Sequence, residues 1–210
     1  MPHRNQPLFY AGTPVAEATS AMVLIHGRGA LAQGMLDLER VLQKEQMAYV
    51  APQAANGSWY PFRFIADIAQ NEPYLTSALD LIDQTVTQLN EAGIATDRIV
   101  LGGFSQGACL ASEYIARNPM RYGGLLVFSG GLIGPPGQLP DYAGNLNNTP
   151  VFIGCSDVDA HIPLHRVEET ADIFTDLGGQ VTKTIYPGMG HTINTDEIKA
   201  AQKILTALDA

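Results

Sequence analysis

The stretch LGGFSQGACLA, residues 101–111, places a serine between glycines at a point where the pattern of the chain changes. Residues 98–101 are mostly apolar and β-branched, which predicts a strand, and residues 108–116 have the composition of a buried helix. Ser105 therefore lies on the turn between them, in the pattern G-x-S-x-G that presents a serine nucleophile above a sheet. A serine that only caps the helix is the alternative. Whether the chain also provides a base and an acid for Ser105 decides between a nucleophile and a helix cap.

Further strands and helices alternate on both sides of this turn. Strands are predicted at residues 21–26, 47–51, 124–128, 150–154 and 180–186, and helices at residues 34–45, 73–91, 163–177 and 194–208. Continuous apolar strands separated by helices are typical of a mostly parallel sheet with helices on both faces. We therefore expect a single α/β domain over residues 1–210, with its ligand at the carboxyl ends of the strands.

The composition argues against several classes of function. The 210 residues are 46% hydrophobic and carry a net charge of −9 without a run of basic residues, which disfavours binding to nucleic acid. No apolar run reaches membrane-spanning length, so we expect a soluble, cytoplasmic protein with no stable membrane insertion. Cys109 and Cys155 lie in apolar segments and indicate neither a disulfide nor a metal site. We expect no metal and no cofactor.

A serine nucleophile needs a base, and three histidines follow Ser105 in the chain: His161, His165 and His191. His191 ends a glycine-rich loop between the last predicted strand and the last predicted helix, where α/β-hydrolases carry their base. We expect His165 on a helix surface. His161 is expected in the loop entering that helix, either as a cap or lining the site. The order and position favour His191 as the base.

The acid that orients this base is expected between the serine and the histidine in the chain. Residues 154–163 follow another apolar strand and offer Asp157 and Asp159. Alternate residues of a loop point in different directions, so we expect one aspartate to reach the histidine and the other to form a turn. An aspartate-rich turn with no catalytic role is the alternative. It is disfavoured because serine, acid and histidine signals occur in the right order, each after a strand.

An oxyanion hole completes such a site, and it combines two backbone N–H groups. One belongs to the residue after the nucleophile, here Gln106. The other comes from the loop after an early strand, here residues 26–30, which places Arg28 in that position. Removing one such donor typically costs about 3 kcal/mol of transition-state stabilisation. His26, in the same loop, is expected to be a buried, hydrogen-bonded histidine and not a second base.

Short motifs along almost the whole chain, from about residue 20 to residue 208, resemble one known family. They are His26-Gly27-Arg28-Gly29, Ala51-Pro52, Ser58-Trp59-Tyr60, residues 102–107, Phe128-Ser129-Gly130, Asp159 four residues before Pro163, and Gly190-His191. The chain is similar to the phospholipase/carboxylesterase family of α/β-hydrolases, which also contains the acyl-protein thioesterases. The resemblance implies the α/β-hydrolase fold and a possible homodimer.

The same resemblance implies a role for each site residue. Ser105 would be the nucleophile, Asp159 the acid and His191 the base, and the spacing to Pro163 selects Asp159 over Asp157. The backbones of Arg28 and Gln106 would form the oxyanion hole. Two departures from the family pattern concern the substrate: Arg28 stands where many relatives have an apolar residue, and Pro61 stands where thioesterase members have an aspartate after the Trp-Tyr pair. These departures favour a small carboxylesterase.

The remaining expectations concern the substrate. Only about twenty residues separate Ser129 from the strand at Pro150, so we expect no cap domain and an open site. The aromatic loop, residues 56–64, emerges at the same rim of the sheet as Ser105. Its Trp59, Phe62 and Phe64 either anchor the loop or line the pocket for the substrate, with His161 as a further candidate for the lining.

The sequence thus predicts a serine carboxylesterase for short- to medium-chain esters, with a small-molecule ester as its partner. A lysophospholipase or acyl-thioester hydrolase with the same three residues is the first alternative. A non-catalytic relative that binds a small ligand is the second, and the complete set of serine, acid and histidine argues against it.

Overall fold

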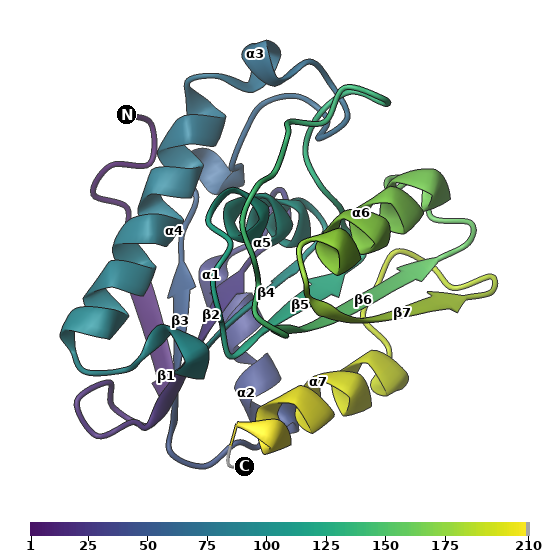
Figure 1. The fold of residues 1–210 in the computed structure, drawn as a ribbon. Helices are drawn as coiled ribbons and strands as arrows, with labels where there is room; N and C mark the ends of the chain where they lie inside the picture. The colour runs from purple at the N-terminus through teal and green to yellow at the C-terminus, as the bar shows by residue number, and fades with distance from the viewer. Residues whose placement is uncertain (209–210) are drawn as a thin grey trace.

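Seven strands form the central sheet of the computed structural model, which describes residues 1–208 (Figure 1). They lie in the order β1-β3-β2-β4-β5-β6-β7, and all neighbours pair in parallel except β1 with β3. The strands are β1 (Leu8–Gly12), β2 (Ser20–Ile25), β3 (Met47–Pro52), β4 (Ile99–Phe104), β5 (Gly124–Phe128), β6 (Pro150–Ser156) and β7 (Gln180–Tyr186). The central strands β2 to β6 are almost entirely buried because helices cover both of their faces.

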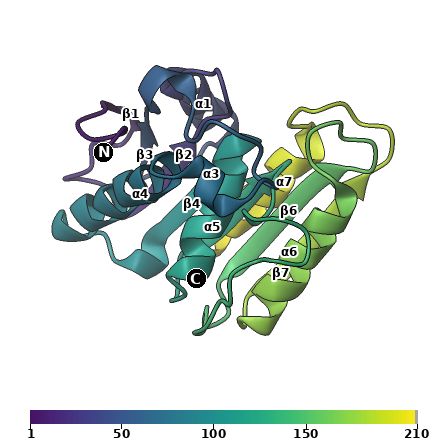
Figure 2. The same cartoon turned by 90° about the horizontal axis from the view of Figure 1, so that it is seen from above.

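Helices pack on the two faces of the sheet, as Figure 2 shows from above. One face carries α4 (Tyr74–Glu91), α5 (Gln106–Arg117) and α6 (Leu164–Asp176), and the other carries α1 (Ala32–Leu36), α2 (Leu38–Leu42) and α7 (Thr195–Ala207). The shorter helices are α3 (Ile68–Asn71), η1 (Ala55–Gly57) and η2 (Thr96–Arg98). Side chains alternate along β2: Val23 belongs to the core of the first face and Met22 to that of the second. The predicted mostly parallel sheet with two helical layers is confirmed.

The connection between β5 and β6 is short and irregular. Residues 129–149 contain neither a helix nor a strand, so no cap domain is inserted there in the described chain. The carboxyl end of β4 is partly exposed at Phe104 and Ser105. Within residues 1–208, none of the helices is both long enough and apolar enough to cross a bilayer.

One sequence-based expectation about secondary structure was wrong, and one strand was missed. The single helix expected over residues 34–45 is instead two short helices, α1 and α2, which meet at Asp37. The edge strand β1 was not predicted at all. It runs antiparallel to β3, and its half-exposed pattern lacks the continuous apolar run of the central strands.

Helix α7 starts with a buried carboxyl group. Asn194 and Glu197 form a capping box. Oδ1 of Asn194 accepts a hydrogen bond from the backbone N–H of Glu197, and Oε2 of Glu197 accepts one from the backbone N–H of Asn194. Glu197 has no exposed surface, and its Oε1 has no hydrogen-bond partner within the described residues. Burial raises the pKa of the Glu197 carboxyl from 4.5 to about 7, although the hydrogen bond from Asn194 acts in the opposite direction.

This carboxyl group should make the stability of the protein depend on pH. Between about pH 4.5 and 7 the folded chain holds a proton that the unfolded chain releases, so the free energy of unfolding should fall by about 3 kcal/mol as pH rises. Glu197→Gln keeps the capping box and should remove this slope in denaturant titrations between pH 5 and 8. The exposed Glu168→Gln is the control. Parallel pH profiles for wild type and Glu197→Gln would contradict the assignment.

Candidate active site

Ser105 lies on a sharp turn between β4 and α5. Its backbone has φ 55° and ψ −119°, a conformation that is rare for a residue with a side chain. The flanking glycines allow this turn: a Cβ on Gly103 would lie 2.4 Å from the carbonyl carbon of Gly107, and one on Gly107 would lie 2.1 Å from the carbonyl oxygen of Ile25. The two outer positions of the G-x-S-x-G pattern are therefore restricted to glycine by steric contact.

A chain of hydrogen bonds links Ser105 to two residues from other strand ends. Nε2 of His191 lies 2.9 Å from Oγ of Ser105, and Nδ1 of His191 lies 2.7 Å from Oδ2 of Asp159. Because a carboxylate only accepts, the imidazole proton sits on Nδ1 and leaves Nε2 free to accept from the serine hydroxyl. This is the arrangement in which a histidine takes the proton of an attacking serine.

The Asp159 side chain is fully covered and accepts hydrogen bonds from three N–H groups. Besides His191, the backbone N–H groups of His161 and Ile162 donate to its Oδ1 at 2.8 and 3.1 Å. Burial alone would raise the pKa of Asp159, but the hydrogen bonds from His191 and from the two N–H groups outweigh it, so the pKa is lowered. Asp159 therefore remains ionised and can stabilise a positive charge on the imidazole.

Asp157, the other candidate acid, has a different partner. Its Oδ1 accepts a hydrogen bond of 2.8 Å from the backbone N–H of Gly188, in the loop between β7 and α7 that carries His191. It does not contact the imidazole. Asp157 thus connects two loops, which goes beyond the turn-forming role expected from the sequence.

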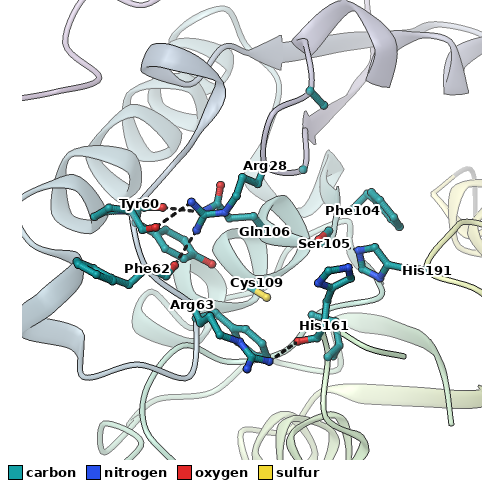
Figure 3. Close-up of a pocket in the computed structure, with 15 residues that line it drawn as sticks. Arg28, Tyr60, Phe62, Arg63, Phe104, Ser105, Gln106, Cys109, His161 and His191 are labelled. Carbon is teal, nitrogen blue, oxygen red and sulfur yellow. Dashed lines mark hydrogen bonds between the residues drawn. The ribbon is translucent and has the colours of Figure 1, made fainter. Parts of the chain in front are cut away.

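Ser105 and His191 open into a cavity of about 580 Å³ (Figure 3). Apolar surface dominates its wall, and the aromatic loop supplies one side of it through residues 60–64. Phe104, the residue before the serine, packs against the His191 ring with 4.7 Å between ring centroids. The chemistry this arrangement allows is nucleophilic attack by a serine on a carbonyl group held in an apolar pocket.

Comparison with known proteins identifies the family of this chain. The family model described as phospholipase/carboxylesterase matches residues 12–208. The chain belongs to the phospholipase/carboxylesterase family. A crystal structure of a phospholipase/carboxylesterase from Dyadobacter fermentans superposes with a TM-score of 0.94 at 42% identity, covering 98% of this chain and 99% of that one. The fold is therefore the α/β-hydrolase fold that the sequence predicted.

More distant relatives include an esterase and an acyl-protein thioesterase. The structure of esterase PE8 has a TM-score of 0.79 at 25% identity and covers 97% of this chain and 98% of its own. Acyl-protein thioesterase 1 of Saccharomyces cerevisiae is 28% identical over 214 residues, 88% of this chain and 91% of the yeast protein. Together with the family match, these relatives make the protein a hydrolase of esters or thioesters.

Two side chains next to the nucleophile hold the aromatic loop of this family member. Oε1 of Gln106 accepts a hydrogen bond of 3.0 Å from the backbone N–H of Trp59, and Nε2 of Gln106 donates one of 2.8 Å to the Tyr60 carbonyl. Arg28 donates from Nη1 to Oγ of Ser58 and to the Pro61 carbonyl, and from Nη2 to the Phe62 carbonyl. The side chains of the two expected oxyanion residues therefore position the cavity wall.

The backbones of Arg28 and Gln106 remain available for an oxyanion. Neither N–H group donates a hydrogen bond to another of residues 1–208, and Gln106 is the first residue of α5. Both residues line the cavity together with Ser105. A helix N-terminus favours negative charge at this place. The oxyanion hole stays a prediction that these positions support.

Of the four pocket candidates, Phe62, Phe64 and His161 line the cavity, and Trp59 does not. Trp59 has no exposed surface, so it cannot contact a ligand there. Its Nε1 donates to the His26 carbonyl at 2.8 Å, and its ring packs between His26 and His3. It anchors the loop to the core, the alternative that the sequence left open.

His26 is the buried, hydrogen-bonded residue expected from the sequence. Its Nε2 accepts from the backbone N–H of Ala54 at 3.0 Å, and its Nδ1 donates to the Gly27 carbonyl at 2.8 Å. Burial lowers the pKa of His26, so the ring is neutral and fixes the loop that carries Arg28. Among residues 1–208, no three histidine, cysteine, aspartate or glutamate side chains are grouped to hold a metal ion.

Sequence reasoning missed several residues of the cavity wall. They are Tyr60, Arg63, Phe104, Cys109 and Ile162. Tyr60, Arg63 and Phe104 belong to motifs that the sequence already singled out. Cys109 lies one turn of α5 after Ser105, a spacing that could have indicated it. Burial raises the pKa of its thiol to about 12, so it remains protonated and acts as apolar wall.

Proposed function

We propose that this protein is a serine carboxylesterase that hydrolyses short- to medium-chain carboxylic esters through an acyl-enzyme on Ser105. The observation that carries the proposal is the hydrogen-bonded series of Ser105, His191 and Asp159 at the mouth of an apolar cavity. The family match and the esterase relatives support the same reaction class.

In the proposed reaction, His191 accepts the Ser105 proton as the serine oxygen attacks the ester carbonyl. The backbone N–H groups of Arg28 and Gln106 stabilise the oxyanion, and Asp159 stabilises the imidazolium. His191 then gives the proton to the leaving alcohol. A water molecule, deprotonated by His191, attacks the acyl-enzyme, and His191 returns this proton to the Ser105 oxygen as the carboxylic acid leaves. The proton transfers between Ser105 and His191, and the support from Asp159, use side chains that already lie within hydrogen-bonding distance of one another.

The size of the cavity supports short to medium acyl or alcohol groups. Phe64 is almost fully buried and closes part of the wall, whereas Phe62 is 52% exposed and stands at the rim. Each buried methylene contributes up to about 0.8 kcal/mol, which is about fourfold in kcat/KM, until the chain meets the wall. We expect an optimum at about four to eight carbons.

A panel of p-nitrophenyl esters from two to sixteen carbons tests the function and the pocket together. Phe64→Ala should move the optimum to longer chains by about two carbons, because it removes part of the wall. Phe62→Ala should lower kcat/KM for the longer esters about threefold, because it removes contact at the rim. Tyr10→Ala, an exposed aromatic residue outside this cavity, is the control. An optimum at sixteen carbons in wild type, or unchanged profiles in both cavity variants, would refute the short pocket.

A second candidate function is the hydrolysis of acyl thioesters. The specific observation in its favour is the likeness to acyl-protein thioesterases, at 28% identity for the yeast protein. The same three residues would perform this reaction, with a thiol as the leaving group. Comparing an octanoyl thioester with the matching octanoyl ester, each corrected for its rate of reaction with hydroxide, separates the two. A corrected preference for the thioester above about tenfold would favour this second function.

A further inference from the structure

Two arginines of the cavity wall have no acidic partner. Arg28 and Arg63 both line the cavity, and no carboxylate among residues 1–208 forms an ion pair with either guanidinium. The lining contains no aspartate or glutamate, in a chain whose net charge is −9. The wall of the cavity is thus a positively charged region of an acidic protein.

The two guanidinium groups have different amounts of hydrogen bonding. Arg28 donates three hydrogen bonds to the aromatic loop, which fixes its position against residues 58–62. Arg63 donates one hydrogen bond, of 3.3 Å, from Nη2 to the His161 carbonyl. A guanidinium group has five N–H donors, so Arg63 keeps four of them without an acceptor among the described residues. In Figure 3 its side chain reaches from the aromatic loop toward His161.

We infer that the cavity selects esters that carry a second, anionic group away from the scissile bond, with Arg63 as the anchor for that anion. This inference rests on the proposed esterase function and names its substrate class. A carboxylate or a phosphate would accept two parallel hydrogen bonds from the free N–H groups of Arg63. The positive charge of Arg28 strengthens the attraction, while its hydrogen bonds hold the loop that carries Arg63.

The alternative is an entirely apolar substrate, with Arg63 acting only as a bridge between two loops. The one hydrogen bond of Arg63, 3.3 Å long and to a neutral carbonyl, compensates little of the cost of desolvating its guanidinium group. An apolar chain beside Arg63 would cover the other N–H groups without providing an acceptor. Long-range electrostatics work against an anionic substrate, since the whole chain carries −9. A preference for the anionic ester would therefore have to come from local groups in the cavity.

Two pairs of matched esters test the inference, one for each side of the scissile bond. Monomethyl adipate and methyl hexanoate differ only in the far end of the acyl chain. The acetate esters of 6-hydroxyhexanoate and of hexanol differ only in the far end of the alcohol. We expect kcat/KM, corrected for the rate of reaction with hydroxide, to be at least about tenfold higher for the anionic member of one pair. The preference should shrink as salt is added, because Arg63 is exposed.

Variants identify the anchor. In Arg63→Gln, the ratio of kcat/KM for the anionic over the neutral ester should fall about tenfold, and Arg63→Lys should keep part of it. Arg40→Gln makes the same change in net charge at an exposed site on α2 and should leave the ratio unchanged. Ratios at or below one in both wild-type pairs, or an equal fall in Arg63→Gln and Arg40→Gln, would overturn the inference.

The neutral esters separate this inference from the proposed function. Hydrolysis of methyl hexanoate and hexyl acetate without any preference for their anionic partners would leave the esterase function intact and reject the anion anchor. If all four esters are left unhydrolysed, and p-nitrophenyl esters as well, both proposals fail.

Discussion

Ser105→Ala should abolish ester hydrolysis, lowering kcat/KM by about 10⁴-fold or more, while the protein remains folded. The hydroxyl is the group that His191 would deprotonate, and within the described residues it makes its hydrogen bond to that ring alone. Alanine keeps the Cβ and meets the same positive φ of 55° as serine, so the turn is no more strained than before. The measurement is kcat/KM for p-nitrophenyl butyrate in wild type and variant.

The control for this prediction is stability. The free energy of unfolding of Ser105→Ala should lie within about 1 kcal/mol of that of the wild type, because no packing in the core is lost. A folded Ser105→Ala protein that keeps more than about one hundredth of the wild-type kcat/KM would show that another group is the nucleophile.

Asp159→Asn should have the second-largest effect, lowering kcat by about 10³–10⁴-fold. The carboxylate selects the histidine tautomer with its proton on Nδ1, and an amide facing the ring can stabilise the opposite tautomer, which cannot accept the serine proton. Asp157→Asn is the matched control, since it lies two residues away and its remaining oxygen can still accept from Gly188. We expect Asp157→Asn to lower kcat by less than about tenfold.

The comparison of the two aspartates can fail in a recognisable way. Equal losses in both variants would mean that the loop after β6 acts as a unit through its contact with Gly188, or that the acid is not Asp159. Thermal unfolding of each variant, measured alongside, shows whether a loss of activity follows from a loss of folded protein.

Much of the fold and of the site was accessible from the sequence because both depend on local patterns. The central strands are buried on both faces and therefore read as continuous apolar runs. The turn at Ser105 needs glycine at two positions for steric reasons, so it leaves a recognisable motif. His191 and Asp159 follow strands whose carboxyl ends lie at one edge of the sheet. Chain order and position after a strand nominated His191 and left Asp157 and Asp159 as candidate acids, and the family resemblance selected Asp159.

Other features depend on contacts between distant segments and left no local signal. Strand β1 depends on its pairing with β3, and none of its own residues is buried. A tryptophan in an aromatic loop can line a cavity or pack into the core, and the sequence around Trp59 is compatible with both. Only the tertiary structure shows that it packs against His3 and His26. The Arg28 side chain donates to the backbone carbonyl groups of residues 61 and 62. Every residue has such a carbonyl group, so no sequence pattern could indicate this contact.

The central claim is that Ser105 forms a covalent acyl-enzyme, and mass spectrometry of the intact protein tests it most directly. A fluorophosphonate that mimics the tetrahedral intermediate should add one group per chain, and peptide mapping should place it on Ser105. Ser105→Ala should form no adduct, and an excess of ester substrate should slow labelling of the wild type. Unlabelled wild-type protein that is folded, or an adduct on any other residue, would contradict the account.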